Sequence, residues 1–413
     1  MKKYKLGDII EVTRGASLSG NYYATSGKYI RLTCGHFDYR NNSFKENTSK
    51  DNLYYTGEFR ADFLLDKGDL ITPLTEQAIG LLGSTAWIPE SGKYIQSQDI
   101  AKIRCNEELL DKQFAYYLIS SNMVRQQLSA AAQQTKIRHT SPDKIKDCTV
   151  WLPSLAEQKQ IGRLLFDIDR KIALNRSINH NLEAMAKQLY DYWFVQFDFP
   201  DENGKPYKSN GGEMIYSDAL KKYIPKGWTH SPLRILVDLE DFKRIPLSNA
   251  QRAERKGEFP YYGATGIMDY IDDFIFDYDI LLLAEDGSTS DSNGFPVVQY
   301  VWGEVWVNNH AHIILPKDRA HLIYTYFLLK SIPVKMIETG SIQKKISQEN
   351  LLGYKAINAP KQLRDIYTER IKPMWEQKKL ATEEIIQLTK LRDSLLPLLM
   401  NGQVSVNYDL SND

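Results

Sequence analysis

Two histidines one residue apart are the first candidates for chemistry in this 413-residue sequence. His310 and His312 flank Ala311, so both side chains would point to the same face of a strand. Imidazole groups can bind zinc, but a metal site needs further ligands, and no partner cluster accompanies this pair. Three cysteines show neither metal-like nor redox spacing and are expected to be buried free thiols: Cys34, Cys105 and Cys148. We therefore expect structural histidines and no metal site.

Motifs that mark enzyme active sites are missing from the sequence. It contains no G-x-x-x-x-G-K-[ST] loop, no G-x-G triplet and no Pro-Pro pair, the last of which is usual in amino-methyltransferase pockets. It also contains no G-x-S-x-G and no H-E-x-x-H motif. The sequence therefore predicts neither an active site nor a bound cofactor.

Charge is balanced overall but uneven along the chain. Lys and Arg number 52, as do Asp and Glu, which gives a formal net charge of zero. Residues 125–146 hold five basic and one acidic residue, residues 242–258 five basic and two acidic, and residues 269–291 eight acidic and no basic residue. Each basic run is either a solvated face or a surface that meets phosphate. The acidic run should face away from phosphate or toward a partner.

A weak internal repeat suggests that one domain occurs twice. Three separated blocks match at an offset of 210 residues: Asp69–Ile71 with Asp279–Leu281, Ile100–Ile103 with His310–Ile313, and Phe114–Ser121 with Tyr324–Ser331. A constant offset favours duplication over chance similarity. Short β-branched and aromatic runs predict strands in both copies: Lys28–Thr33, Ala61–Thr72, Ile280–Ala284 and Val297–Val307. Helices are predicted over 111–128 and over 319–338, the latter interrupted by Pro333.

Each copy is followed by a long amphipathic helix. Apolar residues recur at alternating steps of four and three from Ile161 to Trp193, and a shift of 206 residues gives a second seam from Tyr367 to Leu399. Asn175 and Asn179 fall on the first seam as polar layers that would fix its register. Such helices can pack on their own domains, but their length favours pairing with each other. If they run antiparallel, the two globular blocks would lie at opposite ends of a rod.

The second seam is less regular than the first. Lys378 and Arg392 interrupt it, and Pro373 and Pro397 are expected to bend or trim the helix. The chain should therefore be an α+β protein with two mixed α/β domains in tandem pseudo-repeat, separated by two long helices that form an antiparallel coiled coil. No apolar stretch is long enough to span a bilayer and the first residues lack a signal-peptide pattern, so a cytoplasmic location is expected.

Several stretches resemble the specificity subunits of type I restriction–modification systems. The run from Leu152 to Ile161, continued to the aromatic cluster Tyr190–Phe194, is similar to their central spacer. Segments that resemble the second recognition domain are Pro206–Gly212, Ile224–Trp228, Phe259–Ile267, Ala284–Gly287 and Asn308–His312. Leu391–Gly402 resembles the distal spacer, whereas Pro360–Arg364 departs from the usual Pro…Glu-Gln signature. The resemblance covers nearly the whole chain and is least specific in the first 150 residues.

The resemblance implies a domain plan and a set of partners. The plan is a target-recognition domain in 1–153, a central spacer helix in 154–199, a linker in 200–213, a second target-recognition domain in 214–360, a C-terminal spacer helix in 361–402 and a tail in 403–413. Family members read a bipartite site on double-stranded DNA. Two methyltransferase subunits that modify adenine dock on the spacer, and translocase–nuclease subunits join for cleavage. S-adenosylmethionine, ATP and Mg would be bound by those partners, leaving this chain non-catalytic and without a cofactor.

Candidate DNA-binding residues lie in the loop before each spacer and in a glycine-rich segment. The loop residues are Gln133, Gln134, Thr135, Lys136 and Arg138 in the first copy and Gln343, Lys344 and Lys345 in the second. Glutamine can pair with adenine and lysine or arginine with guanine, although a solvated turn is the alternative. In the second segment, Tyr262, Gly263 and Thr265 would let backbone approach the duplex, or would form a plain β-turn with packed tyrosines.

A dense aromatic patch is a candidate for partner binding. Tyr190, Tyr192, Trp193 and Phe194 would either dock a methyltransferase subunit or cap the core of their own domain. Two other functions remain open: a stand-alone DNA methyltransferase or nuclease with drifted motifs, and a coiled-coil scaffold that binds only proteins.

Overall fold

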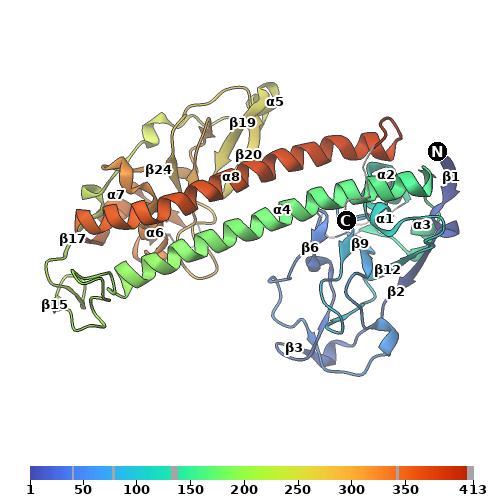
Figure 1. The fold of residues 1–413 in the computed structure, drawn as a ribbon, viewed down its shortest axis with the longest axis horizontal. Helices are drawn as coiled ribbons and strands as arrows, with labels where there is room; N and C mark the ends of the chain where they lie inside the picture. The colour runs from blue at the N-terminus through green and yellow to red at the C-terminus, as the bar shows by residue number, and fades with distance from the viewer. Residues whose placement is uncertain (40, 77–79, 132–137, 341–343, 407–413) are drawn as a thin grey trace. The chain divides into compact units, whose positions relative to one another are not determined.

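The computed structural model describes residues 1–413 except residues 40, 77–79, 132–137, 341–343 and 407–413 (Figure 1). The chain forms two compact units. The first comprises the described residues of 1–176 and of 383–413, and the second comprises those of 177–382. Each unit therefore contains one recognition-type domain and part of both long helices. In the described part of the chain, no helix combines the length and the apolar character that crossing a membrane requires.

Two long helices follow the two mixed α/β regions. Helix α4 spans Leu155–Tyr190 and continues into a π-helical turn at Asp191–Val195, and helix α8 spans Lys361–Met400. Pro373 and Pro397 both lie inside α8, so the expectation that they trim the helix is wrong. A proline inside a helix costs about 3 kcal/mol because it removes one hydrogen bond and adds a steric clash. Burial of the α8 side chains that neighbour each proline, including Trp375 and Leu399, opposes that cost.

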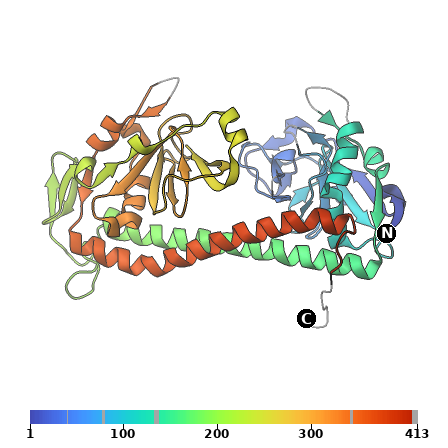
Figure 2. The same ribbon diagram turned by 90° about the horizontal axis from the view of Figure 1, so that it is seen from above.

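In the first unit, the start of α4 lies beside the end of α8 (Figures 1 and 2). Asp169 accepts a hydrogen bond from Arg392 at 2.8 Å, and Asn175 donates to Glu384 at 2.7 Å. Residue numbers rise along α4 while those of their partners fall along α8, so the helices run antiparallel here. Arg392, which interrupts the predicted apolar seam, is thus accommodated by an ion pair with a carboxylate of the facing helix.

In the second unit, the end of α4 pairs with the start of α8 in the same sense. Asn179 donates to Thr382 at 2.8 Å, Glu183 forms a 2.8 Å ion pair with Lys378, and Tyr367 donates to the Ala186 carbonyl at 2.9 Å. The predicted pairing of the two helices is therefore confirmed. Asn175 is buried and Asn179 half-buried, and each bonds to a polar side chain of α8, as expected of polar layers that fix a register.

The first unit holds two four-stranded sheets and several two-stranded pairings. Its strands are β1 (Lys2–Lys5), β2 (Ile10–Arg14), β3 (Tyr23–Ala24), β4 (Tyr29–Arg31), β5 (Phe37–Asp38), β6 (Ser43–Phe44), β7 (Tyr54–Tyr55), β8 (Leu70–Pro73), β9 (Thr75–Glu76), β10 (Ala86–Trp87), β11 (Tyr94–Ile95), β12 (Ile100–Cys105), β13 (Arg138–His139) and β14 (Thr149–Leu152). Its shorter helices are α1 (Lys112–Ser120), α2 (Asn122–Ala131) and α3 (Pro142–Lys146). The main sheet has the order β10-β8-β12-β2 and is antiparallel throughout.

The second unit repeats the main sheet and, in its described residues, also holds a three-stranded sheet. Its strands are β15 (Met214–Ser217), β16 (Lys222–Pro225), β17 (Thr229–Pro232), β18 (Val237–Leu239), β19 (Lys256–Gly263), β20 (Gly266–Ile271), β21 (Ile280–Ala284), β22 (Val298–Val301), β23 (Trp306–Val307), β24 (Ala311–Pro316), β25 (Glu338–Thr339), β26 (Lys345–Ile346) and β27 (Lys355–Asn358). Its shorter helices are α5 (Asn249–Glu254), α6 (Leu322–Lys330) and α7 (Gln348–Gly353). The main sheet, β22-β21-β24-β18, has the strand order and the antiparallel pairing of the first unit.

Strand registers confirm the internal repeat and refine its offset. Ile100 pairs with Pro73 in the first unit, and Ala311 pairs with Ala284 in the second, a shift of 211 residues in each strand. The following helices, α1 and α6, are related by 210 residues, as the sequence blocks predicted. The one-residue difference in the strands matters because neighbouring strand residues face opposite sides of the sheet.

Both domains bury their main sheet beneath a short helix and the adjoining long helix. In the first unit, Phe114 and Leu118 of α1 share a core with Ile161 and Leu165 of α4. In the second unit, the corresponding helix α6 is buried almost entirely, and its Phe327 ring lies 5.9 Å from that of Tyr190. The long helices are therefore integral to both cores.

The predicted linker over 200–213 is ordered and packed. Asp198 accepts a hydrogen bond from the Ser209 amide at 2.7 Å, and the Phe199 ring stacks at 4.7 Å on that of Tyr207. Phe199 also stacks on Trp228 at 5.2 Å. This segment consequently attaches the end of α4 firmly to the second domain.

Candidate nucleic-acid interface

In both units, the segment that precedes the last strand (β14 or β27) lies against residues that follow a central strand of the main sheet (β8 or β21). The Thr140 amide donates to the Leu74 carbonyl at 2.9 Å in the first unit, and the Ile346 amide donates to the Glu285 carbonyl at 2.8 Å in the second. Leu74 and Glu285 are related by the 211-residue shift of the strands. The described residues that follow the two candidate DNA-binding loops, Thr140 and Ile346, therefore make equivalent contacts in the two domains.

The described basic residues of these loops are accessible and each pairs with a carboxylate. Arg138 lies 3.6 Å from Glu76, Lys344 lies 3.2 Å from Glu338, and Lys345 lies 3.1 Å from Glu285. Their side chains are 43%, 51% and 55% exposed, so a large part of each remains open to solvent. The other predicted loop residues lie outside the described part of the chain: Gln133, Gln134, Thr135, Lys136 and Gln343.

The glycine-rich segment forms a β-hairpin whose turn is Ala264 and Thr265. Strands β19 and β20 end in the pair Gly263 and Gly266, and Gly266 has a φ of +148°, a value that favours glycine. Thr265 is exposed, whereas Tyr262 is half-buried and Gly263 buried. Burial raises the pKa of Tyr262 to about 12, so its hydroxyl is protonated near neutrality. The packed turn of the second interpretation is thus present, with Thr265 as the predicted contact residue that faces outward.

Charges of the basic run 242–258 are largely compensated within the second domain. Arg252 and Lys256 contact Asp269 at 3.3 and 2.6 Å, and Arg255 contacts Asp272 at 2.8 Å. Their carboxylate partners belong to the acidic run 269–291. The two opposite runs therefore meet each other, which supports a structural role for the basic run and gives little support to its contact with phosphate.

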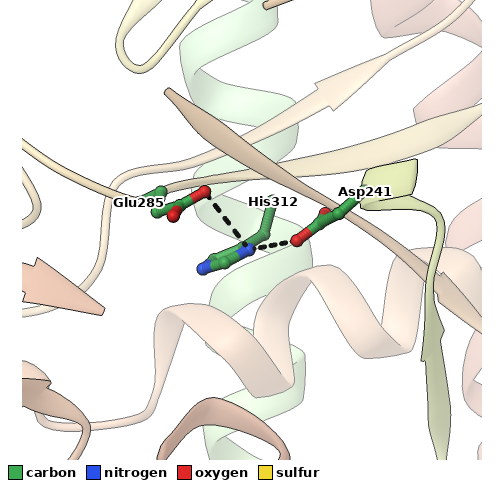
Figure 3. Close-up of side chains that lie close together, drawn as sticks. All are labelled: Asp241, Glu285 and His312. Atoms are coloured by element: carbon green, nitrogen blue, oxygen red, sulfur yellow. Dashed lines mark hydrogen bonds and ion pairs between the residues drawn. The ribbon is translucent and has the colours of Figure 1, made fainter. Parts of the chain in front are cut away.

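His312 lies between Asp241 and Glu285 in a buried polar network (Figure 3). Its Nδ1 is 2.6 Å from Asp241 Oδ2, its Nε2 is 2.8 Å from the Ile346 carbonyl oxygen, and Glu285 Oε2 is 3.8 Å from Nδ1. Asp241 begins the 3-10 turn Asp241–Lys243 that follows β18, whereas Glu285 follows β21 directly. His312 is fully buried in β24.

Hydrogen bonding identifies the ionisation state of this network. A carbonyl oxygen can only accept, so Nε2 of His312 carries a proton, and Nδ1 is the natural donor to the Asp241 carboxylate. Burial lowers the pKa of His312, but the bond to Asp241 and its charge, the Ile346 carbonyl and Glu285 together raise it above the ordinary value. Burial raises the pKa of Asp241, but the His312 contacts outweigh it and the net direction is downward. These contacts and the raised pKa favour the imidazolium form of His312 beside the Asp241 and Glu285 carboxylates.

This charge pattern does not suit a metal ion, although Asp241, Glu285 and His312 lie close enough to hold one. Both nitrogens of an imidazolium bear protons and have no lone pair for a metal. Arg244 contacts Glu285 at 2.6 Å and Asp241 at 3.4 Å, so a guanidinium already neutralises the carboxylates. His312 is recognisable in the sequence beside His310, whereas its partner Asp241 lies 71 residues earlier, carries no motif and was not predicted.

A second acidic group with a histidine lies at the start of α8. Asp318, His321 and Asp365 are close together, and His321 Nε2 is 2.6 Å from Asp365 Oδ1. Lys361 Nζ lies 2.9 Å from Asp318 and 3.1 Å from Asp365. The lysine ammonium thus takes the position between the carboxylates, and the group functions as an ion-pair cluster that holds the first turn of α8.

The predicted aromatic docking patch lies mostly inside the second domain. Tyr190, Trp193 and Phe194 are 3%, 2% and 5% exposed and belong to its core, and Tyr192 is half-buried beside them. The Phe194 ring lies 4.9 Å from that of Tyr324 and 5.3 Å from that of Tyr367. This placement agrees with the alternative that the cluster caps its own core, and it leaves little of the patch available to a partner.

These features define a tandem pair of recognition-type domains on an antiparallel helix pair. A model of the type I restriction modification DNA specificity domain matches residues 1–184 and 225–362. The chain belongs to this family.

Named relatives and a solved structure are similar over different shares of the chain. The MjaIX type I restriction enzyme specificity subunit of Methanocaldococcus jannaschii is 26% identical over 311 residues, which cover 71% of this chain and 69% of that protein. A putative type I specificity subunit of Haemophilus influenzae, S.HindORF215P, is 29% identical over 120 residues, or 29% of this chain and 30% of that protein. The crystal structure of an S subunit from M. genitalium has the same fold, with a TM-score of 0.58 at 16% identity, over 96% of this chain and 95% of that one.

Proposed function

We propose that this chain is the DNA-recognition subunit of a type I restriction–modification complex, in which each domain reads one half of a bipartite site. The observation that carries the proposal is the repeated topology: one sheet order occurs twice, and each copy leads into one of two paired helices. Two similar recognition domains, each leading into one of two paired helices, suit a DNA site with two halves. The helix pair would then set the unspecified gap between those halves.

Contacts to DNA are proposed for the equivalent loops of the two domains. Arg138, Lys344 and Lys345 are the described basic side chains there, and their exposure supports a role in binding phosphate or guanine. Their carboxylate partners would hold the long side chains in place in the free protein. Thr265 at the turn of the β19–β20 hairpin is a further proposed contact.

Chemistry on DNA is assigned to partner subunits. Two methyltransferase subunits would modify adenine with S-adenosylmethionine, and translocase–nuclease subunits would use ATP and Mg. The present chain would position them and perform no reaction itself. Burial of Trp193 and Phe194 directs the search for the docking surface toward other side chains of the spacer helices.

A domain exchange tests the proposal. Residues 1–150 are replaced by the corresponding domain of another specificity subunit, and the modified sequence is mapped on genomic DNA after co-expression with the methyltransferase subunits. We expect one half of the recognised sequence to change while the other half and the gap persist. A change in both halves would contradict modular reading.

Two control measurements address the other functions. Methyl transfer by the purified chain alone would identify a stand-alone enzyme. Failure to bind any duplex in the presence of the methyltransferase subunits would identify a protein scaffold.

A further inference from the structure

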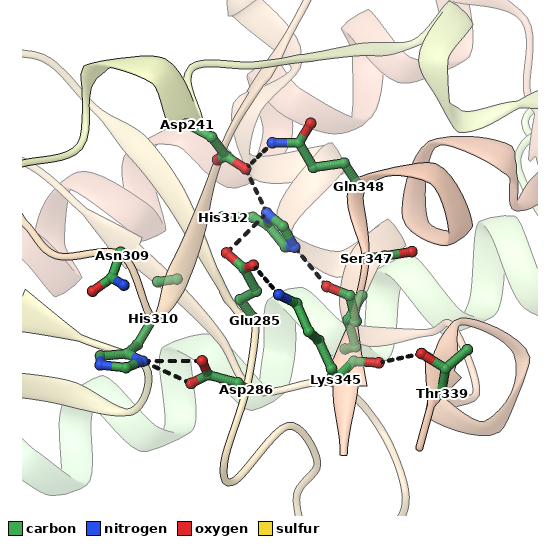
Figure 4. A network of polar contacts seen from close by, with 12 residues as sticks. Asp241, Glu285, Asp286, Asn309, His310, His312, Thr339, Lys345, Ser347 and Gln348 are labelled. Carbon is green, nitrogen blue, oxygen red and sulfur yellow. Dashed lines mark hydrogen bonds and ion pairs between the residues drawn. The ribbon is translucent and has the colours of Figure 1, made fainter. Parts of the chain in front are cut away.

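The segment Lys345–Gln348 of the second domain is fixed from several sides (Figure 4). The Ile346 amide donates to the Glu285 carbonyl at 2.8 Å, and the Ile346 carbonyl accepts from His312 at 2.8 Å. Lys345 pairs with Glu285 at 3.1 Å, and Gln348 donates to Asp241 at 2.6 Å. Through these contacts, a short stretch beside a predicted DNA-binding loop is tied to the turn after β18 and to the end of β21.

His312 contacts both the turn after β18 and the segment Lys345–Gln348. Its Nδ1 bonds to Asp241, which also accepts from Gln348, and its Nε2 bonds to the Ile346 carbonyl. The ionised groups that contact the ring are Asp241 and Glu285, and Arg244 and Lys345 pair with Glu285 at 2.6 and 3.1 Å. Every donor of the ring is used, so rotation or loss of the imidazole would leave a buried carbonyl without its donor.

The described residues of the first domain do not repeat this arrangement. With the 211-residue strand shift, the position of His312 is occupied by Ala101 and that of Glu285 by Leu74. In that domain the backbone bond from Thr140 to Leu74 is retained, but neither side chain can reproduce the ring or the carboxylate. Among the residues that the structure describes, the network is therefore found in the second copy and not in the first.

We propose that His312 is a positioning residue of the second recognition domain, whose ring holds Lys344 and Lys345 in the orientation that reads one half of the DNA site. The inference rests on the proposed function, because it assigns those lysines to DNA. Its specific content is that reading of one half-site, and not of the other, depends on the donor that His312 presents to Ile346.

A pair of matched variants tests the role of the ring. The amide nitrogen of glutamine overlaps Nε2 of histidine, whereas that of asparagine overlaps Nδ1, so His312→Gln keeps the donor to Ile346 and His312→Asn keeps the donor to Asp241. The full chain, assembled with its methyltransferase subunits, is used to select duplexes from a library with a random central region. Selected sequences from the wild type should show two specified blocks separated by a gap.

The expected result is asymmetric. His312→Gln should retain both blocks, whereas His312→Asn should lose enrichment of one block by about tenfold, the size of one lost base contact, and retain the other. Equal behaviour of the two variants, or equal weakening of both blocks by His312→Asn, would overturn the inference. A wild-type selection without two blocks would instead refute the proposed function, so the two failures are distinguishable.

A measurement on the unmutated chain covers the case in which His312→Asn does not fold. The titration of His312 is located by NMR of histidine-labelled protein, and the selection is repeated one pH unit below and one above that midpoint. A His310→Asn chain serves as the control for the neighbouring histidine. We expect one block to weaken above the midpoint in both chains, because the Asp241 carboxylate retains the Nδ1 proton and the donor to Ile346 is the one lost. An unchanged block, with the NMR spectra showing that Nε2 has lost its proton, would overturn the inference.

Discussion

The carboxylate of Glu183 on α4 lies 2.8 Å from the ammonium of Lys378 on α8. Glu183 also pairs with Lys330 at 2.8 Å and accepts from the Tyr326 hydroxyl at 2.7 Å. Burial raises the pKa of Glu183, but the two lysines outweigh this and lower it from 4.5 to about 2. One carboxylate thus joins both long helices to α6 in the second unit.

Glu183→Gln should destabilise the protein most clearly near neutral pH. The shift in pKa corresponds to about 3 kcal/mol, an upper value for what ionised Glu183 contributes to the free energy of unfolding. Because the folded-state pKa is lowered, this contribution is present above about pH 4.5 and is lost as the pH falls toward 2. Chemical denaturation at several pH values measures it. Glu213→Gln, which breaks an ion pair 63% exposed on both sides, is the control and should have little effect.

Replacing Arg392 should lower the free energy of unfolding, because Arg392 belongs to a largely buried ion pair. Its side chain is 11% exposed and lies 2.8 Å from Asp169, which also accepts from the Tyr117 hydroxyl at 2.6 Å. Arg392→Met leaves Asp169 without its cation, and we expect a loss of about 3 kcal/mol in the free energy of unfolding. Adding Asp169→Asn removes the orphaned charge and keeps an acceptor for Tyr117, so the double variant should recover at least half of that loss. A double variant no more stable than Arg392→Met would contradict this account.

Lys344→Ala should weaken DNA binding in a way that depends on salt. If Lys344 meets a phosphate, the slope of log affinity against log salt should fall by about one. Lys256→Ala is a matched control, because Lys256 is also exposed and paired with a carboxylate, Asp269, at 2.6 Å. Titration of a selected duplex at four salt concentrations gives both slopes. Equal slopes for Lys344→Ala and the wild type would remove this residue from the interface.

Replacement of Gly15 or Gly263 by alanine should change protein stability to different extents. A Cβ at Gly15 would lie 2.2 Å from the Gln96 carbonyl oxygen, which is backbone, whereas a Cβ at Gly263 would meet Met268 Sδ at 2.4 Å. Met268 is 55% exposed and can move. Thermal unfolding should therefore show a loss of about 2 kcal/mol or more for Gly15→Ala and under about 1 kcal/mol for Gly263→Ala. Similar losses for both would show that Met268 cannot adjust.

Periodicity and repetition allowed the architecture to be predicted. The seam from Ile161 to Trp193 predicted a helix because long amphipathic patterns are specific, and the repeat predicted two similar domains. Pro373 and Pro397 do not trim α8, because the local cost of proline in a helix is smaller than the stabilisation from packing along the whole helix. The strand offset was one residue off because hydrophobic blocks without a distinctive residue align equally well over neighbouring positions.

The site was less accessible to sequence reasoning. The basic run around Arg252 attracted attention through its charge, but its acidic partners lie on the following strands and only the fold brings the two runs together. Tyr190 and Trp193 looked suited to docking because aromatic residues favour interfaces and cores alike. The Asp241 contact of His312 could not be anticipated, because the two residues meet only through the pairing of β18 with β24.

One pairing in each domain has a consequence for how such proteins diversify. In the first domain β1 pairs with β14, and in the second β17, which follows the β15–β16 hairpin, pairs with β27. An early strand of each domain therefore runs beside the strand that leads into a long helix. A reading domain can therefore be excised and replaced at a single place in space, with both splice points on adjacent strands. Recombination between genes could exchange such a cassette where the core residues that pack on the helices are kept. Under the proposed function, a new half-site would then arise in one step.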